Sequence, residues 1–140
     1  MRLVAVSHTG QFSGAERVLV RALRAAVEEG WDVTCLSPDG PLATVLERAG
    51  VARRPLPELT LPPGPRLLAA VGLLVRWFRA VGPVRRASAD ADVVLANGLL
   101  ALPVLRLDRT RARVPVAWLV HDVVVRPDRL RLLRRSGPAV

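Results

Sequence analysis

The stretch SHTGQFSGAE, residues 7–16, joins a short apolar run to a helical pattern. A strand, a glycine-bearing turn and a helix start form a phosphate-binding shape, because free backbone amides and the positive end of the helix dipole face the turn. Gly14 suggests such a ligand, since glycine within a helix costs about 1 kcal/mol relative to alanine and would let something approach the backbone. Ser13 and Glu16 need no ligand, because S-x-x-E is a capping box worth about 1 kcal/mol by itself.

The glycine turn does not match the common nucleotide-binding motifs. It lacks the middle glycine of the dinucleotide fingerprint G-x-G-x-x-G, and it lacks the G-K-[ST] of a P-loop. Thr9, Gly10 and Gly14 come nearer to the TGxxxG turn of short-chain dehydrogenases, and LANG, residues 95–98, is similar to an asparagine-glycine strand end of those enzymes. That family needs a tyrosine and a lysine for proton transfer, and this sequence contains neither, which excludes dehydrogenase catalysis.

Strand patterns alternate with helical patterns along the chain. Apolar runs predict strands over residues 2–7, 31–37, 92–96 and 115–120, and a more polar strand is predicted over 51–56. Helical periodicity predicts helices over 14–29, 41–49 and 66–81, a helix or turn over 99–107 and a basic helix over 126–135, and prolines make 55–65 a stiff loop. This order predicts an α/β fold, a Rossmann-like parallel sheet flanked by helices, in a single domain of 140 residues.

The carboxyl ends of the predicted strands carry polar residues or glycine. In parallel sheets of this kind, functional side chains gather at those ends. Here the ends are Ser7-His8, residues 37–39, Asn97-Gly98 and His121-Asp122. The sequence predicts no metal site, because its two histidines are far apart and Cys35 is its single cysteine. The lone Cys35 also excludes internal disulfides.

The positive charge of the chain comes from arginine alone. The formal net charge is +9, and arginine is densest over residues 106–135, where the acidic residues are Asp108, Asp122 and Asp128. Such a block attracts phosphates, nucleic acid or an anionic membrane, and a solvated surface is an equal alternative. A non-enzymatic Rossmann-like module whose arginine-rich tail binds nucleic acid or an acidic partner is therefore a second hypothesis. An aromatic content of 4% argues against nucleic acid, because few rings are present to stack on bases.

Three segments in order resemble the amino-terminal domain of family-4 glycosyltransferases, which have the GT-B fold. Residues 10–51, GQFSGAERVLVRALRAAVEEGWDVTCLSPDGPLATVLERAGV, are similar to the family's G-G-A-E-R turn, amphipathic helix, strand and proline–glycine turn. ADADVVLANG, residues 89–98, and VPVAWLVHD, residues 114–122, are similar to two later strands of the family, the second of which ends in histidine. The resemblance runs from residue 1 to about residue 127.

The resemblance implies transfer of a sugar, with retention, from a nucleotide sugar to an acceptor that is a glycan, a lipid or a small molecule. It implies no cofactor and no obligatory metal. His121 matches a catalytic histidine, and Ser13 and Gly14 match the glycine pair of the family's donor-facing loop. Arg17 is expected to face the donor phosphate, with solvent exposure as an equal alternative. The acceptor side is expected to include His8, Asn97, Gly98 and Asp122, although Asp122 equally suits a helix N-cap.

The carboxyl-terminal donor-binding domain of the family has no counterpart in residues 1–140. A truncated product, an excised domain and one half of a split transferase with a separate donor-binding chain all remain open. We therefore expect residues 1–140 to form a single amino-terminal domain, incomplete at its carboxyl end. Such a domain alone should not bind a nucleotide sugar tightly.

The predicted helix over residues 66–81 is strongly apolar. With Trp77 beside Arg76 and Arg79 it could rest on a membrane surface as a peripheral contact. The favoured interpretation is that its apolar residues cover the sheet, namely Leu67, Leu68, Val71, Leu74 and Val75. The run 67–75 is cut off by Arg76, so no apolar run is expected to cross a bilayer, and the start of the chain does not resemble a signal peptide. The expected location is the cytoplasm, with the inner face of the membrane as an alternative.

Overall fold

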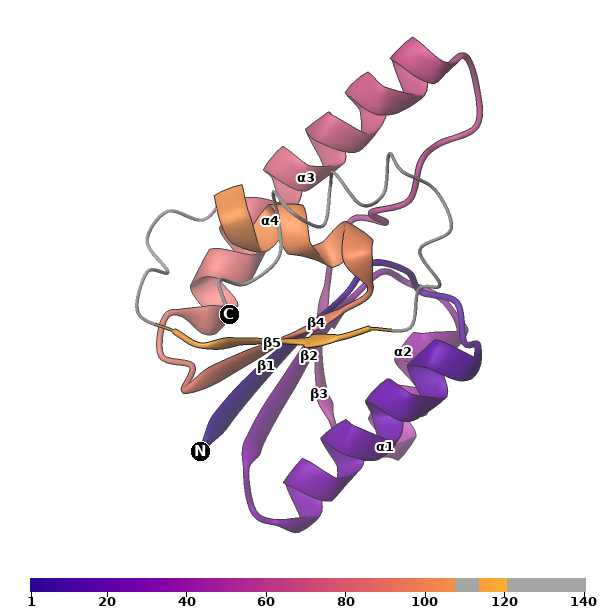
Figure 1. Cartoon of the computed structure of the whole chain (residues 1–140). Helices are drawn as coiled ribbons and strands as arrows, with labels where there is room; N and C mark the ends of the chain where they lie inside the picture. The colour runs from indigo at the N-terminus through magenta and orange to yellow at the C-terminus, as the bar shows by residue number, and fades with distance from the viewer. Residues whose placement is uncertain (108–113, 121–140) are drawn as a thin grey trace.

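The computed structural model describes residues 1–107 and 114–120. Over these residues five parallel strands form one sheet in the order β3-β2-β1-β4-β5 (Figure 1). The strands are β1 (Arg2–Ser7), β2 (Asp32–Ser37), β3 (Ala52–Pro55), β4 (Val93–Asn97) and β5 (Val116–Leu119). Each lies within or next to a predicted strand, including the more polar β3, and the parallel α/β sheet is confirmed.

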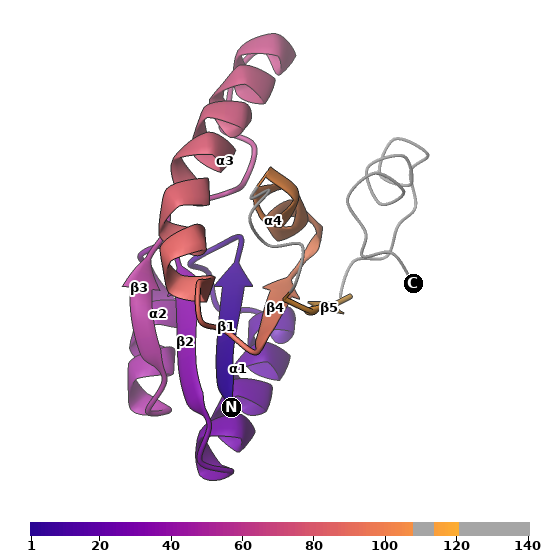
Figure 2. The same ribbon diagram turned by 90° about the vertical axis from the view of Figure 1, so that its left-hand side faces the viewer.

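Helices cover both faces of this sheet. α1 (Gly14–Glu28) and α2 (Pro41–Arg48) lie on one face, while α3 (Arg66–Ser88), η1 (Leu99–Ala101) and α4 (Leu102–Leu107) lie on the other (Figures 1 and 2). Side chains of β1 alternate between two cores: Leu3 and Ala5 pack with α1 and α2, whereas Val4 and Val6 pack with α3 and α4. Because both faces are buried, β1 is apolar throughout rather than alternating with polar residues.

α3 continues beyond the predicted end of the helix. The expected helix ended at residue 81, but the helix continues through Pro83 and ends at Ser88. The last turns are held by packing, since Val84 and Ser88 are buried and Ser88 Oγ donates a hydrogen bond of 2.5 Å to the carbonyl of Val84. Tertiary packing therefore outweighs the local preference of proline to end a helix.

The face that α3 turns to the sheet is not the predicted one. Leu67, Leu68, Val71, Leu74 and Val75 were expected to cover the sheet, yet all five are exposed. The buried residues of α3 are Ala69, Leu73, Ala80, Val84 and Ser88, which lie on the opposite side of the helix. By length and composition alone α3 is apolar enough to cross a membrane, because the helix continues past Arg76 as far as Ser88.

Candidate functional site

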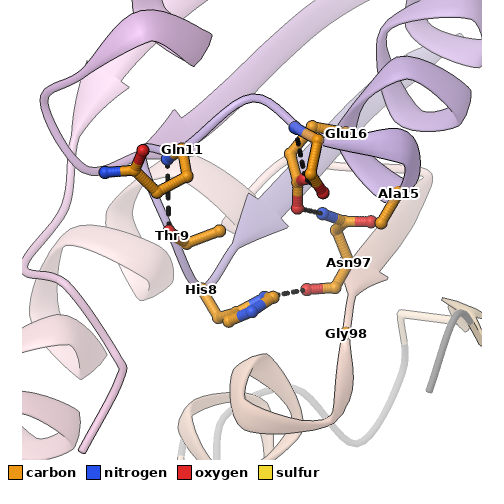
Figure 3. A pocket seen from close by; sticks show the side chains of 8 residues that line it. His8, Thr9, Gln11, Ala15, Glu16, Asn97 and Gly98 are labelled. Atoms are coloured by element: carbon orange, nitrogen blue, oxygen red, sulfur yellow. Dashed lines mark hydrogen bonds between the residues drawn. The ribbon is translucent and has the colours of Figure 1, made fainter. Parts of the chain in front are cut away.

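A cavity of about 230 Å³ lies where the glycine turn meets the carboxyl ends of β1 and β4. The chain order of the sheet reverses between these two strands, so the connections that leave them run to opposite faces and open a crevice. Residues from both strand ends and from the start of α1 line it (Figure 3): His8, Thr9, Gln11, Ser13, Ala15, Glu16, Asn97 and Gly98. The structure thus brings together His8, Ser13, Asn97 and Gly98, which the sequence singled out at separate places.

Glu16 is buried in the first turn of α1 although it carries a carboxylate; its exposed fraction is 2%. Its Oε2 accepts hydrogen bonds from the amide of Ser13 at 3.1 Å and from the hydroxyl of Ser13 at 2.5 Å, and the predicted capping box forms. Burial alone would raise the pKa of Glu16, but these hydrogen bonds and the nearby His8 outweigh burial and lower that pKa below its ordinary value of 4.5. The carboxylate is therefore held in its ionised form by partners inside the protein.

Asn97 is fully buried at the end of β4 and connects this strand to β1 and α1. Its Nδ2 donates to Ser7 Oγ at 3.3 Å and, over a longer 3.4 Å, to Glu16 Oε1 (Figure 3). Ser7 Oγ in turn donates to the carbonyl of Thr9 at 3.1 Å. Among the described residues Asn97 Oδ1 has no hydrogen-bond partner, so one buried acceptor of this network stays unused within the described protein.

His8 lies against the backbone of Gly98 on the other side of the cavity. Its Nδ1 is 3.0 Å from the carbonyl oxygen of Asn97, and a carbonyl can only accept a hydrogen bond. Nδ1 therefore carries the proton, and in the neutral ring Nε2 is an acceptor. Residue 98 must be glycine for this contact, because its φ is +83° and a Cβ there would lie 2.7 Å from His8 Nδ1.

The proline-rich loop 55–65 is tied to the site by hydrogen bonds that the sequence did not predict. The amide of Leu59 donates to the carbonyl of His8 at 2.9 Å, and Thr9 Oγ1 donates to Glu58 Oε1 at 3.3 Å. From α3, Arg76 donates to the carbonyls of Glu58 and Thr60 at 3.2 Å each. The loop thus connects β1 to α3. Glu58 is a site neighbour that sequence reasoning missed, because only the fold brings it to Thr9 in the glycine turn.

The comparison that decides the family covers most of the chain. Residues 12–139 match the family described as Glycosyltransferase Family 4. The chain belongs to this family. No curated protein sequence gives a significant match.

Solved structures place the family-4 domain among GT-B folds. HepE from Anabaena, solved in complex with UDP-glucose, aligns with a TM-score of 0.68 and 22% identity over 97% of this chain and 34% of its own. MurG from Acinetobacter baumannii aligns with a TM-score of 0.63 and 16% identity over 99% of this chain and 43% of its own. At such identities the likeness shows the fold alone. The chain spans about a third of the length of HepE, since the alignment covers 34% of that protein.

A third neighbour has a different chemistry on a related fold. A deacetylase from teicoplanin biosynthesis, solved with teicoplanin, aligns with a TM-score of 0.55 and 14% identity over 83% of this chain and 68% of its own. The family match, not the sheet, therefore separates this chain from the deacetylase. Among the described residues of the family-4 domain, no cluster of histidine, cysteine, aspartate or glutamate could hold a metal ion.

Gly14 and Arg17 lie on the first turns of α1 in this family-4 domain. A Cβ at Gly14 would meet no protein atom within 4 Å, so the protein's own packing does not require glycine there. The guanidinium of Arg17 lies 5.8 Å from the ring centroid of Phe12, and Arg17 is exposed and does not line the cavity. The donor-facing roles assigned to Ser13, Gly14 and Arg17 stay predictions.

His121 and Asp122 lie outside the described residues, as does the basic segment 126–135. The structure describes the strand that precedes them: β5 pairs with β4 so that Leu119 is opposite Asn97, and the amide of Gly98 donates to the carbonyl of Leu119 at 3.4 Å. Leu119 therefore pairs with Asn97, which lines the cavity, and His121 follows Leu119 by two residues in the sequence. The catalytic role of His121 and the acceptor-side role of Asp122 stay predictions.

Cys35 does not contribute to the site. It lies fully buried in β2, and burial raises the pKa of its thiol to about 12, so it stays protonated and unreactive.

Proposed function

We propose that this chain is the acceptor-side half of a glycosyltransferase that moves a sugar from a nucleotide sugar to an acceptor with retention at the anomeric carbon. In this proposal it acts together with a carboxyl-terminal donor-binding domain, supplied by a separate chain or by further sequence. The observation that carries the proposal is the family match over residues 12–139. The complexes of HepE with UDP and UDP-glucose support a nucleotide-sugar donor.

The donor is proposed to approach the start of α1. The free space beside Gly14 supports this position of the donor, because no neighbouring protein atom requires a glycine there. The amides of the first turn of α1 also present positive charge to it. The carboxylate of Glu16 would otherwise oppose an anionic donor, but it is turned inward onto Ser13 and Asn97. Arg17, exposed on the next turn, is proposed to add positive charge on the same side.

The acceptor is proposed to lie over the strand ends. His8 would accept a hydrogen bond from an acceptor hydroxyl at Nε2, since its Nδ1 proton is already donated to the carbonyl of Asn97. Gly98 leaves the room that this ring needs, and Asp122 is proposed to lie on the same side. His121 is proposed to contact the sugar at the reacting centre. We propose no such role for Glu16, because its carboxylate is buried and already accepts hydrogen bonds from Ser13.

We further propose a cytoplasmic location for the reaction. The free, buried Cys35 is consistent with a reducing compartment. The alternative of a nucleic-acid-binding module finds no support in the comparisons, and most of the arginine-rich segment on which it depends lies outside the described residues.

Sugar transfer in trans tests the proposal. The full chain would be incubated with a panel of nucleotide sugars that includes UDP-glucose and with a pool of acceptors, with and without a carboxyl-terminal family domain. We expect transfer only when both proteins are present, and a loss of about 100-fold or more in His121→Ala, the scale of removing one group that stabilises the transition state. Arg48→Ala, an exposed change on α2, is the control and should keep full activity. Absence of transfer in every combination would overturn the proposal.

A further inference from the structure

The amino-terminal half of α3 exposes a continuous apolar surface. Its members are between 46% and 76% exposed, and we call them the α3 apolar face: Leu67, Leu68, Val71, Leu74, Val75 and Phe78. Because successive residues of a helix are rotated by about 100°, these positions fall within an arc of about 120°. Leu61, in the loop before α3, is also exposed at 59%. Exposed apolar side chains that lie singly are common, but a continuous set on one helix face marks an interaction surface.

The exposure does not mean that α3 is detached from the fold. On its opposite side Leu73, Ala80 and Val84 are buried, and Ala80 and Val84 pack in the core with residues of the sheet. Trp77 is half-buried against the same core and donates from Nε1 to the carbonyl of Leu100 at 3.0 Å. Arg76, held by two loop carbonyls, likewise turns toward the protein. The α3 apolar face is therefore the outer side of a firmly anchored helix.

The segment of the sequence that carries this face is basic. Between residues 59 and 89 the sequence has no aspartate or glutamate, and its charged residues are Arg66, Arg76, Arg79, Arg85 and Arg86. Four of them, all except Arg76, are exposed and form no ion pair within the described part of the chain. Apolar side chains on one helix face, together with arginines and no acids, favour an anionic lipid surface.

We propose that the α3 apolar face docks onto the surface of an anionic lipid bilayer. The charge pattern disfavours a second copy of this chain, because a symmetric contact would bring the arginines of both helices together with no acidic residue to pair them. The helix would lie on the bilayer rather than cross it. The carboxyl-terminal half of α3 is anchored in the core through Trp77, Ala80 and Val84. The part before Trp77, residues 66–76, would span only about 16 Å, against about 30 Å for the hydrocarbon core.

Docking in this way brings the candidate site close to the membrane. In Figure 2 the strands β1 and β4 point upward, and the amino-terminal half of α3 extends above their carboxyl ends. The cavity lies at those same ends. The inference goes beyond the proposed function and does not depend on it, since membrane binding requires neither a donor nor an acceptor.

Vesicle flotation of the full chain, without nucleotide sugar, tests the inference. The chain would be mixed with vesicles of phosphatidylcholine containing phosphatidylglycerol, and in parallel with vesicles of phosphatidylcholine alone. Val71→Glu places a charge on the α3 apolar face. Val18→Glu makes the same change on α1 at a valine of similar exposure, 47% against 50%, and keeps the same net charge. Circular dichroism of each variant would verify that it is folded.

We expect the wild-type chain to float with the anionic vesicles and to bind the neutral ones more weakly. Val71→Glu should weaken binding to anionic vesicles by about tenfold or more, because an apolar contact is replaced by a charge, while Val18→Glu should bind as the wild type does. Failure of the wild type to float, equal binding of both vesicle types, or equal binding by the two variants would overturn the inference. So would a wild-type dimer that Val71→Glu dissociates, since a second copy would then cover the face.

Discussion

His8 depends for its orientation on Gly98, a residue at the end of a different strand. The imidazole occupies the space in which any other residue at position 98 would place its Cβ, and the carbonyl of Asn97 then fixes the Nδ1 proton. A neighbouring strand end thus determines that Nδ1 of His8 carries the proton and that Nε2 of the neutral ring can accept a hydrogen bond. The sequence placed His8 and Gly98 at the same edge of the sheet, but their contact requires the pairing of β1 with β4.

Replacing Gly98 with alanine tests this dependence. Gly98→Ala should destabilise the fold by about 1–2 kcal/mol through the positive φ of residue 98, and it should displace His8, with a further loss of about 1 kcal/mol for its hydrogen bond. Gly30→Ala is the matched control, because Gly30 has a similar φ of +78° but a Cβ at that position would meet no atom within 4 Å. Urea unfolding of both variants measures the difference. Equal losses would contradict the role of Gly98 in positioning His8.

Local and long-range contacts of Glu16 differ in how far the sequence could predict them. The capping box with Ser13 follows from a spacing of three residues, and the structure contains it. The bond from Asn97 to the same carboxylate joins residues 81 positions apart, and no local pattern predicts it. At the candidate site, sequence reasoning therefore identified the residue types and the edge of the sheet, while the hydrogen-bond network followed from strand order.

On the level of elements, α3 shows what periodicity leaves undecided. Both sides of this helix carry apolar residues, so a 3.6-residue pattern could not tell which side meets the sheet. The side that packs is the one with small residues, Ala69 and Ala80, which allow a close approach, and the larger side chains of Leu67 and Leu68 point outward. α1 and α2 were predicted well, because each of them has a single apolar face.

Alanine substitutions at two adjacent leucines of α3 distinguish its faces. Leu73 is 6% exposed and Leu74 is 46% exposed. Leu73→Ala should lower the free energy of unfolding by about 2–4 kcal/mol, because it leaves a cavity under the helix. Leu74→Ala should change it by no more than about 0.5 kcal/mol, because its side chain is on the surface. Chemical denaturation of both variants measures the effect. A larger loss in Leu74→Ala than in Leu73→Ala would instead support the packing predicted from the sequence, in which Leu74 covers the sheet.

For the molecule as a whole, strand order creates the site. The sequence predicted parallel strands joined by helices, but not that β1 would lie in the centre with β2 on one side and β4 on the other. That order places the turn after β1 beside the end of β4 and tethers both to α1 through Glu16 and Asn97. The deacetylase neighbour shows that a similar sheet serves another chemistry, so the function must be argued from these residues and from the family match.

The stability of the whole domain should depend on this network in acid. The pKa of Glu16 is lower in the folded protein than its ordinary 4.5, so below about pH 4.5 the unfolded chain takes up the proton first. The stabilising contribution is therefore complete above that pH and is lost as the pH falls through the folded-state pKa. Glu16→Gln should reduce the free energy of unfolding by about 1–3 kcal/mol at neutral pH, because a charged acceptor is removed, and should flatten its fall in acid. Urea unfolding across this pH range measures the effect, and Glu47→Gln, an exposed change on α2, is the control. If the free energy of unfolding varied with pH in parallel for Glu16→Gln and the wild type, the buried carboxylate would not stabilise the fold.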